Sequence, residues 1–168
     1  MTSMPTEVWQ RGAVTGYAPL LMPVVHSFLQ VKEELDALAS ELDDDMLWND
    51  GAGAASVGFH IRHIGGSTER LLTYARGEQL TTAQLAAARA EATERPTLAM
   101  LLADTQAALD RALAQVRATP VDTLLAERKV GRAGLPSTTL GLLFHAAEHA
   151  TRHAGQALTT VRLLKSRR

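Results

Sequence analysis

Apolar residues recur at three- and four-residue steps in four long stretches of the chain, which is the spacing of one face of an α-helix. We expect these helices at residues 19–42 and 56–76, from residue 96 to shortly before residue 120, and from residue 137 to about 164. In the first helix, the apolar stripe consists of Leu20, Leu21, Val24, Val25, Phe28, Val31, Leu35, Leu38 and Leu42. The pattern therefore predicts amphipathic helices that each bury one face.

Capping and chain-breaking residues mark the ends of the helices. Ser56 is placed to cap the second helix, because a serine hydroxyl accepts a free backbone N–H there, and Gly77 is placed to end it. Two prolines fall in the first turns of the first helix. Its start is therefore expected to shift toward Leu21 or Met22.

Two segments between the long helices predict irregular structure. Residues 43–55 are interpreted as a solvated helix exit and a loop, because the carboxylates of Asp43, Asp44 and Asp45 lack the ligand spacing of an EF-hand calcium site. Residues 119–137 contain two prolines and two glycines and form a long connection. The only strand expected is a brief extended piece around Lys129 and Val130.

Together these elements predict an all-α fold, a four-helix bundle with a short extra helix. The extra helix is alanine-rich and extends from a cap at Thr81 or Thr82 to about Ala92. A length of 168 residues favours one compact core over two. We expect a loosely ordered lead-in over residues 1–18 and a single helical-bundle domain over residues 19–168.

Composition and charge exclude several classes of function. The chain has no cysteine, which excludes disulfides, thiolate metal ligands and a cysteine nucleophile. Its net charge of -1 provides no broad positive field, so no nucleic-acid partner is expected. No stretch approaches the roughly 18 apolar residues that span a bilayer, and no signal-peptide pattern is present. We therefore expect a cytoplasmic protein with no membrane partner.

The histidines are the unusual chemical resource of this chain. His145, His149 and His153 follow one another at four-residue steps on the last helix, so they share one face of it. The second helix carries His60 and His63, which are also neighbours on a helix surface. A buried imidazole without a hydrogen bond costs on the order of 1–3 kcal/mol. One metal ion satisfies several imidazoles at once, so the constellation favours a metal site.

Two familiar metal templates fit poorly. The helix of a zinc protease needs Glu directly after its first His, but here Glu148 precedes His149. A di-iron carboxylate bundle needs Glu-x-x-His pairs and further inward glutamates, whereas His145 to Glu148 has the reverse order and the second helix offers only Glu69. Haem held by two histidines stays open, although the chain has no attachment motif and few aromatic residues to line such a pocket.

Two motifs resemble those of a known family. One is the second-helix sequence His63-Ile64-Gly65-Gly66-Ser67, followed by Arg70-Leu71-Leu72 and Tyr74-Ala75-Arg76-Gly77. The other is His149-x-x-x-His153-x-Gly155-Gln156 near the C-terminus. In this order they are similar to the motifs of the DinB-like superfamily, also called the DinB/YfiT-like metalloenzymes. The resemblance covers roughly residues 20 to 165.

This resemblance implies a fold and a ligand set. The fold is an up-down-down-up four-helix bundle, often a homodimer, that binds one divalent metal through three histidines. Carried over to this sequence, the metal ligands are His63, His149 and His153. Nitrogen ligands suit several metals, so zinc or nickel is expected, with iron or manganese as alternatives.

Other residues near these ligands have two interpretations each. His60 and His145 lie about one turn from the ligands and are expected to line the pocket or orient the ligands, with direct ligation as the alternative. Gln156 either hydrogen-bonds metal-bound water or makes a helix–helix contact. Gly65 and Gly66 in mid-helix indicate a tight helix crossing or room for a substrate.

Three histidine ligands leave coordination positions open, which is typical of catalytic rather than structural zinc. The resemblance therefore implies a metal-dependent thiol S-transferase-like or hydrolase-like enzyme that acts on a small molecule, such as a low-molecular-weight thiol. The reactive group would be metal-bound water or thiol, and no catalytic side chain is assigned. The alternative is a non-catalytic metal-binding protein with a stress-response or interaction role, whose surface pairs with itself.

Overall fold

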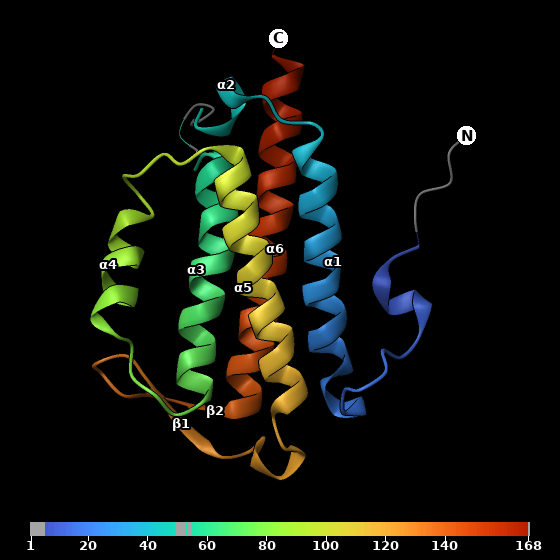
Figure 1. Cartoon of the computed structure of the whole chain (residues 1–168), viewed down its shortest axis with the longest axis vertical. Helices are drawn as coiled ribbons and strands as arrows, with labels where there is room; N and C mark the ends of the chain where they lie inside the picture. The colour runs from blue at the N-terminus through green and yellow to red at the C-terminus, as the bar shows by residue number, and fades with distance from the viewer. Residues whose placement is uncertain (1–5, 50–52, 54, 168) are drawn as a thin grey trace.

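The computed structural model describes residues 6–49, 53 and 55–167 of the chain (Figure 1). Its long helices are α1 (Met22–Ala39), α3 (Val57–Ala75), α5 (Leu98–Ala118) and α6 (Thr139–Ser166). The shorter helices are η1 (Val8–Arg11), η2 (Pro19–Leu21), α2 (Asp44–Leu47), α4 (Thr82–Ala90) and η3 (Val121–Thr123). Two short strands, β1 (Glu127–Val130) and β2 (Leu135–Thr138), form a hairpin. The predicted helical fold class is confirmed.

The four long helices lie side by side. Both α5 and α6 pack against α1 and against α3, so α1 and α3 occupy opposite corners of the bundle. In Figure 1, α5 lies in front and α6 behind, and the colours show α1 and α6 running upward while α3 and α5 run downward. The short helix α4 stands outside the bundle and contacts α3. The antiparallel pair of α3 and α6 carries the predicted histidines.

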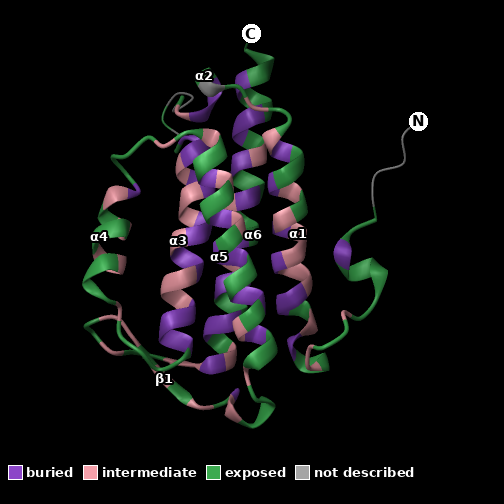
Figure 2. Cartoon of the chain, in the orientation of Figure 1, coloured by how far each residue is buried: buried purple, intermediate pink, exposed green. Residues whose placement is uncertain are grey.

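The core is mainly aliphatic. Figure 2 shows the buried faces of the long helices turned toward one another, whereas α4 has no buried residue. The largest fully buried side chains include Phe28, Leu21, Leu35, Leu47, Ile61, Ile64, Leu109, Leu124 and Leu143. Full burial of such a side chain contributes about 1.5–3 kcal/mol. No helix in the described ranges combines the length and the apolar character needed to cross a bilayer.

The ends of α1 and α3 follow from the capping residues. The Ser56 hydroxyl accepts the backbone N–H of Phe59 at 3.2 Å and so caps α3. After α3, Gly77 adopts a positive φ of 82°, a conformation that glycine reaches without strain. The α-helical part of α1 begins at Met22, because the prolines shift the start. The predicted start of α1 and both predicted ends of α3 are confirmed, whereas α1 ends at Ala39, three residues before its predicted end.

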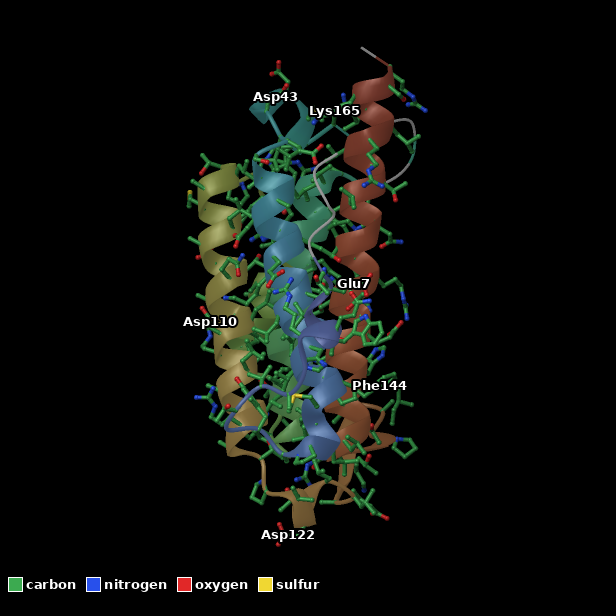
Figure 3. All side chains as sticks on the ribbon, turned by 90° about the vertical axis from the view of Figure 1, so that its right-hand side faces the viewer. Glu7, Asp43, Asp110, Asp122, Phe144 and Lys165 are labelled. Carbon is green, nitrogen blue, oxygen red and sulfur yellow. The ribbon has the colours of Figure 1, made fainter. Side chains whose placement is uncertain are left out.

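Part of the predicted lead-in lies against α1. The backbone N–H of Val8 donates to Gln30 Oε1 at 3.0 Å, and Arg11 forms an ion pair with Glu33 at 2.6 Å. Figure 3 shows this segment, with Glu7, in front of α1. Residues 1–5 of the predicted lead-in lie outside the described residues.

The prediction of a helix exit and loop at residues 43–55 was wrong for its first part. Asp43 accepts the backbone N–H of Met46 at 2.9 Å and caps the one-turn helix α2. Met46 and Leu47 are buried, so packing against the core stabilises a turn that is too short to show a periodic pattern. Residues 50–52 and 54 of the predicted loop lie outside the described residues.

The prediction for residues 119–137 was incomplete. The expected extended piece is β1, but it pairs with a second strand, from Glu127 opposite Thr138 to Val130 opposite Leu135. Pro136 lies in β2, and a proline lowers the strand propensity of a sequence although a sheet edge tolerates it. The hairpin lies at the start of α6, and β1 contacts α3.

Gly65 marks a close approach of α3 to α5. A Cβ at this position would lie 3.2 Å from Thr105 Cα and 3.2 Å from Thr105 Oγ1. The Thr105 hydroxyl donates to the carbonyl of Ile61 at 2.9 Å, which fixes Thr105 in this crossing. Of the two interpretations of Gly65, the structure therefore supports the tight helix crossing.

We predict that Gly65→Ala gives a lower free energy of unfolding than Gly155→Ala, by about 1–3 kcal/mol, because overpacking strains the crossing. Gly155 also lies within a helix, and a Cβ there would meet nothing within 4 Å. Both variants gain the same helix propensity, so their difference reports the crossing alone. Urea unfolding followed by circular dichroism measures it, and equal stabilities would contradict the packing role.

Candidate metal centre

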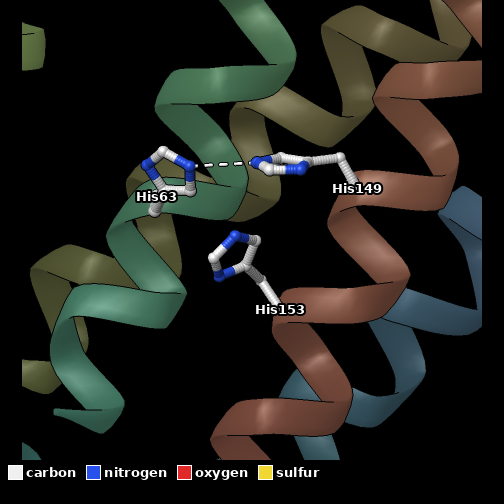
Figure 4. A group of neighbouring side chains, drawn as sticks. All are labelled: His63, His149 and His153. Carbon is white, nitrogen blue, oxygen red and sulfur yellow. Dashed lines mark hydrogen bonds between the residues drawn. The ribbon is translucent and has the colours of Figure 1, made fainter. Parts of the chain in front are cut away.

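Three histidines from α3 and α6 meet in the space between these helices. His63, His149 and His153 each offer a ring nitrogen, and these nitrogens lie within 4.8 Å of one another. Figure 4 shows the rings pointing toward one another, with His63 on one side and the two α6 histidines on the other. The four-residue spacing on α6 places two rings on one face, and the packing of α3 against α6 supplies the third.

The distances within this cluster suit a shared cation. His63 Nε2 lies 3.0 Å from His149 Nε2. Two nitrogens bound tetrahedrally to one zinc ion, each at about 2.0–2.1 Å, lie roughly 3.3 Å apart. The His153 ring centroid lies 4.6 Å from each of the other two centroids. A cation between the three rings would therefore require only small side-chain movements.

Burial favours the neutral imidazole at His149 and His153, which is the form that binds metal. Burial, followed by the neighbouring His63 and His149, lowers the pKa of His153 to about 4. Burial is also the main cause that lowers the pKa of His149, with His63 as the next. The Nδ1 atom of His149 is buried and has no hydrogen-bond partner among the described residues. Neutral His149 and His153 can each donate a lone pair to a divalent metal.

The side of His63 that faces away from the cluster contacts a buried carboxylate. His63 Nδ1 lies 2.6 Å from Glu91 Oε2, and because the carboxylate is the acceptor, Nδ1 carries the proton and donates. Nε2 of His63 is then unprotonated and accepts a hydrogen bond from His149 Nε2 at 3.0 Å. Burial raises the pKa of Glu91, but hydrogen bonds from His63 and Arg70 outweigh this and hold the pKa below its ordinary value.

The fourth imidazole near the cluster belongs to His60. It is 5% exposed, and its Nδ1 lies 2.9 Å from His153 Nδ1. A hydrogen bond between these atoms leaves His153 Nε2 free for another partner. Phe59 covers the cluster from the same helix, since its ring stacks on His63 with centroids 5.3 Å apart. The His63 side chain is still 21% exposed, so the cluster remains accessible from solvent.

A sequence model of the DinB superfamily matches residues 27–157, which include all three histidines of the cluster. The chain belongs to the DinB superfamily. The resemblance predicted from the two histidine motifs is therefore confirmed. A search of curated proteins found no match to this DinB-superfamily chain.

The structure separates the remaining predicted residues of this DinB-superfamily site. His60 lies against His153, as described above. The His145 side chain is 51% exposed, and its Nδ1 lies 3.5 Å from Glu148 Oε2. Its ring centroid lies 5.5 Å from that of His149. Gln156 is exposed on α6 beyond His153. His145 does not belong to the group whose ligand atoms converge within the described part of the chain.

Glu91 is the residue that sequence reasoning missed. It follows α4, and 28 residues separate it from His63, so no helical period or motif connects the two. Only the folding of the α4 segment back against α3 brings them together. A glutamate that is 6% exposed beside a short helix with no buried residue is a signal that only the structure provides.

We predict that the free energy of unfolding of the metal-free protein falls as the pH is lowered from about 7 toward 4. Unfolded His153 titrates near the ordinary value of 6.5 and folded His153 at about 4, so between these values the unfolded chain binds more protons. His153→Gln removes this contribution and makes the decline shallower. Chemical unfolding at several pH values measures it. An NMR titration that placed the pKa of His153 near 6.5 would contradict it.

Proposed function

We propose that this protein binds one divalent metal ion through His63, His149 and His153 and uses it as a thiol S-transferase-like or hydrolase-like enzyme. The observation that supports this proposal is the convergence of three ring nitrogens within 4.8 Å. Three protein ligands leave at least one coordination position for water or substrate, as in catalytic zinc sites. Membership of the DinB superfamily, whose members often bind metal, agrees with this proposal.

The proposed metal is zinc or nickel, with iron or manganese as alternatives, because imidazole ligands suit all of these ions to different degrees. When bound, the ion would supply Lewis acidity, which lowers the pKa of a coordinated water or thiol. The chain's own residues would hold and orient it. Glu91 keeps the proton of His63 on Nδ1, and the contact with His60 leaves Nε2 of His153 free.

The nucleophile in this proposal comes from outside the chain. The protein has no cysteine, so any thiol must arrive with a substrate. A low-molecular-weight thiol or water therefore suits the reaction better than a covalent enzyme intermediate on sulfur. Phe59 stacks on His63 and shields that side of the cluster from water.

The proposed partners follow from the same features. The substrate is a small molecule, and the working assembly is a homodimer, as expected for the DinB-like superfamily. A net charge of -1 argues against nucleic acid as a partner. We place this chemistry in the cytoplasm, where low-molecular-weight thiols are kept reduced.

We predict that His149→Ala or His153→Ala removes most of the bound metal. Each variant leaves the ion with only two imidazole ligands, which hold it far more weakly than three. His26→Ala is the matched control, because it also removes a histidine but on α1, outside the cluster. There the Nε2 atom of His26 donates a hydrogen bond to the carbonyl oxygen of Gly12 at 3.0 Å. Elemental analysis of the purified proteins measures the metal content. Metal retained at the wild-type level in both α6 variants would contradict the ligand assignment.

We predict metal-dependent turnover when the metal-loaded protein is given a thiol and an electrophile. Bacillithiol, mycothiol and glutathione are tested in turn, and hydrolysable esters test the hydrolase alternative. Chelation of the metal should abolish the activity, and adding the metal back should restore it. A protein that binds metal but turns over none of these substrates would instead support the non-catalytic stress-response or interaction role.

A further inference from the structure

Glu91 connects the α4 segment to the metal centre through two hydrogen-bonded contacts. Its Oε2 accepts from His63 Nδ1 at 2.6 Å, and its Oε1 accepts from Arg70 Nη1 at 2.5 Å. The carboxylate is 6% exposed. A buried carboxylate without partners would be strongly destabilising, so the Arg70 ion pair explains how the charge is tolerated. The hydrogen bond to His63 has a different consequence, because His63 is a candidate metal ligand.

Gly66 gives this carboxylate its space. A Cβ on Gly66 would overlap Glu91 Oε1 and lie 2.9 Å from Arg70 Nη1. Any larger residue would therefore push the carboxylate away from His63. The two mid-helix glycines thus have different roles, since Gly65 admits α5 and Gly66 admits the side chain of Glu91. A glycine in a helix costs about 1 kcal/mol relative to alanine, and the carboxylate contact accounts for its presence here.

We propose that Glu91 is the positioning residue of the metal centre. By accepting the Nδ1 proton, it fixes the tautomer of His63, so that the Nε2 lone pair faces His149, and it makes that nitrogen a stronger donor. A carboxylate behind a histidine ligand has this effect in metal sites generally. This inference rests on the proposed function, because the ligand role of His63 is part of that proposal.

The first test measures Zn²⁺ affinity by competition with a chromophoric chelator. Glu91→Ala should weaken binding roughly 10- to 100-fold. Glu91→Gln keeps an acceptor oxygen but loses the charge, so its affinity should lie between those of the wild type and the alanine variant. Glu94→Ala is the matched control, because Glu94 lies in the same segment between α4 and α5. Its carboxylate pairs with Arg62 at 2.6 Å and does not contact His63.

The second test needs no metal. A long-range hydrogen–nitrogen NMR spectrum of the metal-free protein reports which ring nitrogen of His63 carries the proton. The wild type and Glu94→Ala should show the Nδ1–H tautomer, and Glu91→Ala should show a mixture. Gly66→Ala displaces the carboxylate without removing it and should give the same mixture, which guards against a Glu91 variant that fails to fold.

The outcomes separate this inference from the proposed function. If Glu91→Ala binds Zn²⁺ as tightly as Glu94→Ala and leaves His63 as the Nδ1–H tautomer, Glu91 is only a structural anchor for α4 and the inference is overturned. If the wild type binds no metal, the proposed function fails, and the tautomer alone then decides whether Glu91 orients His63. Weaker binding together with the tautomer mixture supports the positioning role.

Discussion

The packing of α3 against α6 determines where the histidines of these two helices meet. It brings imidazoles from two distant parts of the chain close enough for their Nε2 atoms to lie 3.0 Å apart. The buried face of α6 is built largely from alanine, at Ala146, Ala147, Ala150, Ala154 and Ala157. Small side chains let the neighbouring helices approach closely, so the longer imidazoles are the groups that span the space between them.

This arrangement trades stability for a binding site. Burial lowers the pKa of His149 and His153, and the Nδ1 of His149 is buried with no hydrogen-bond partner among the described residues. A bundle optimised for stability alone would place apolar side chains at these positions. A cation that binds only the folded chain offsets this cost, because binding free energy adds to the free energy of unfolding.

The sequence predicted what depends on local spacing. Helix periodicity and the Ser56 cap gave the long helices, and the four-residue step of His149 and His153 gave two members of the cluster. The contribution of His63 required the family resemblance, because periodicity cannot say which helices touch. Glu91 escaped prediction, since only tertiary folding brings it to His63. The turn α2 and the hairpin escaped for a related reason: they are too short to show a period, and contacts with the rest of the molecule stabilise them.

In the proposed function, imidazoles from α3 and α6 share one cation. Anomalous diffraction from crystals of the metal-loaded protein, measured at the absorption edge of the metal, tests this most directly. One peak is expected between the helices, about 2.0–2.2 Å from ring nitrogens of His63, His149 and His153. A peak that lacks any one of these three ligands, or no peak between α3 and α6 at saturating metal, would contradict it.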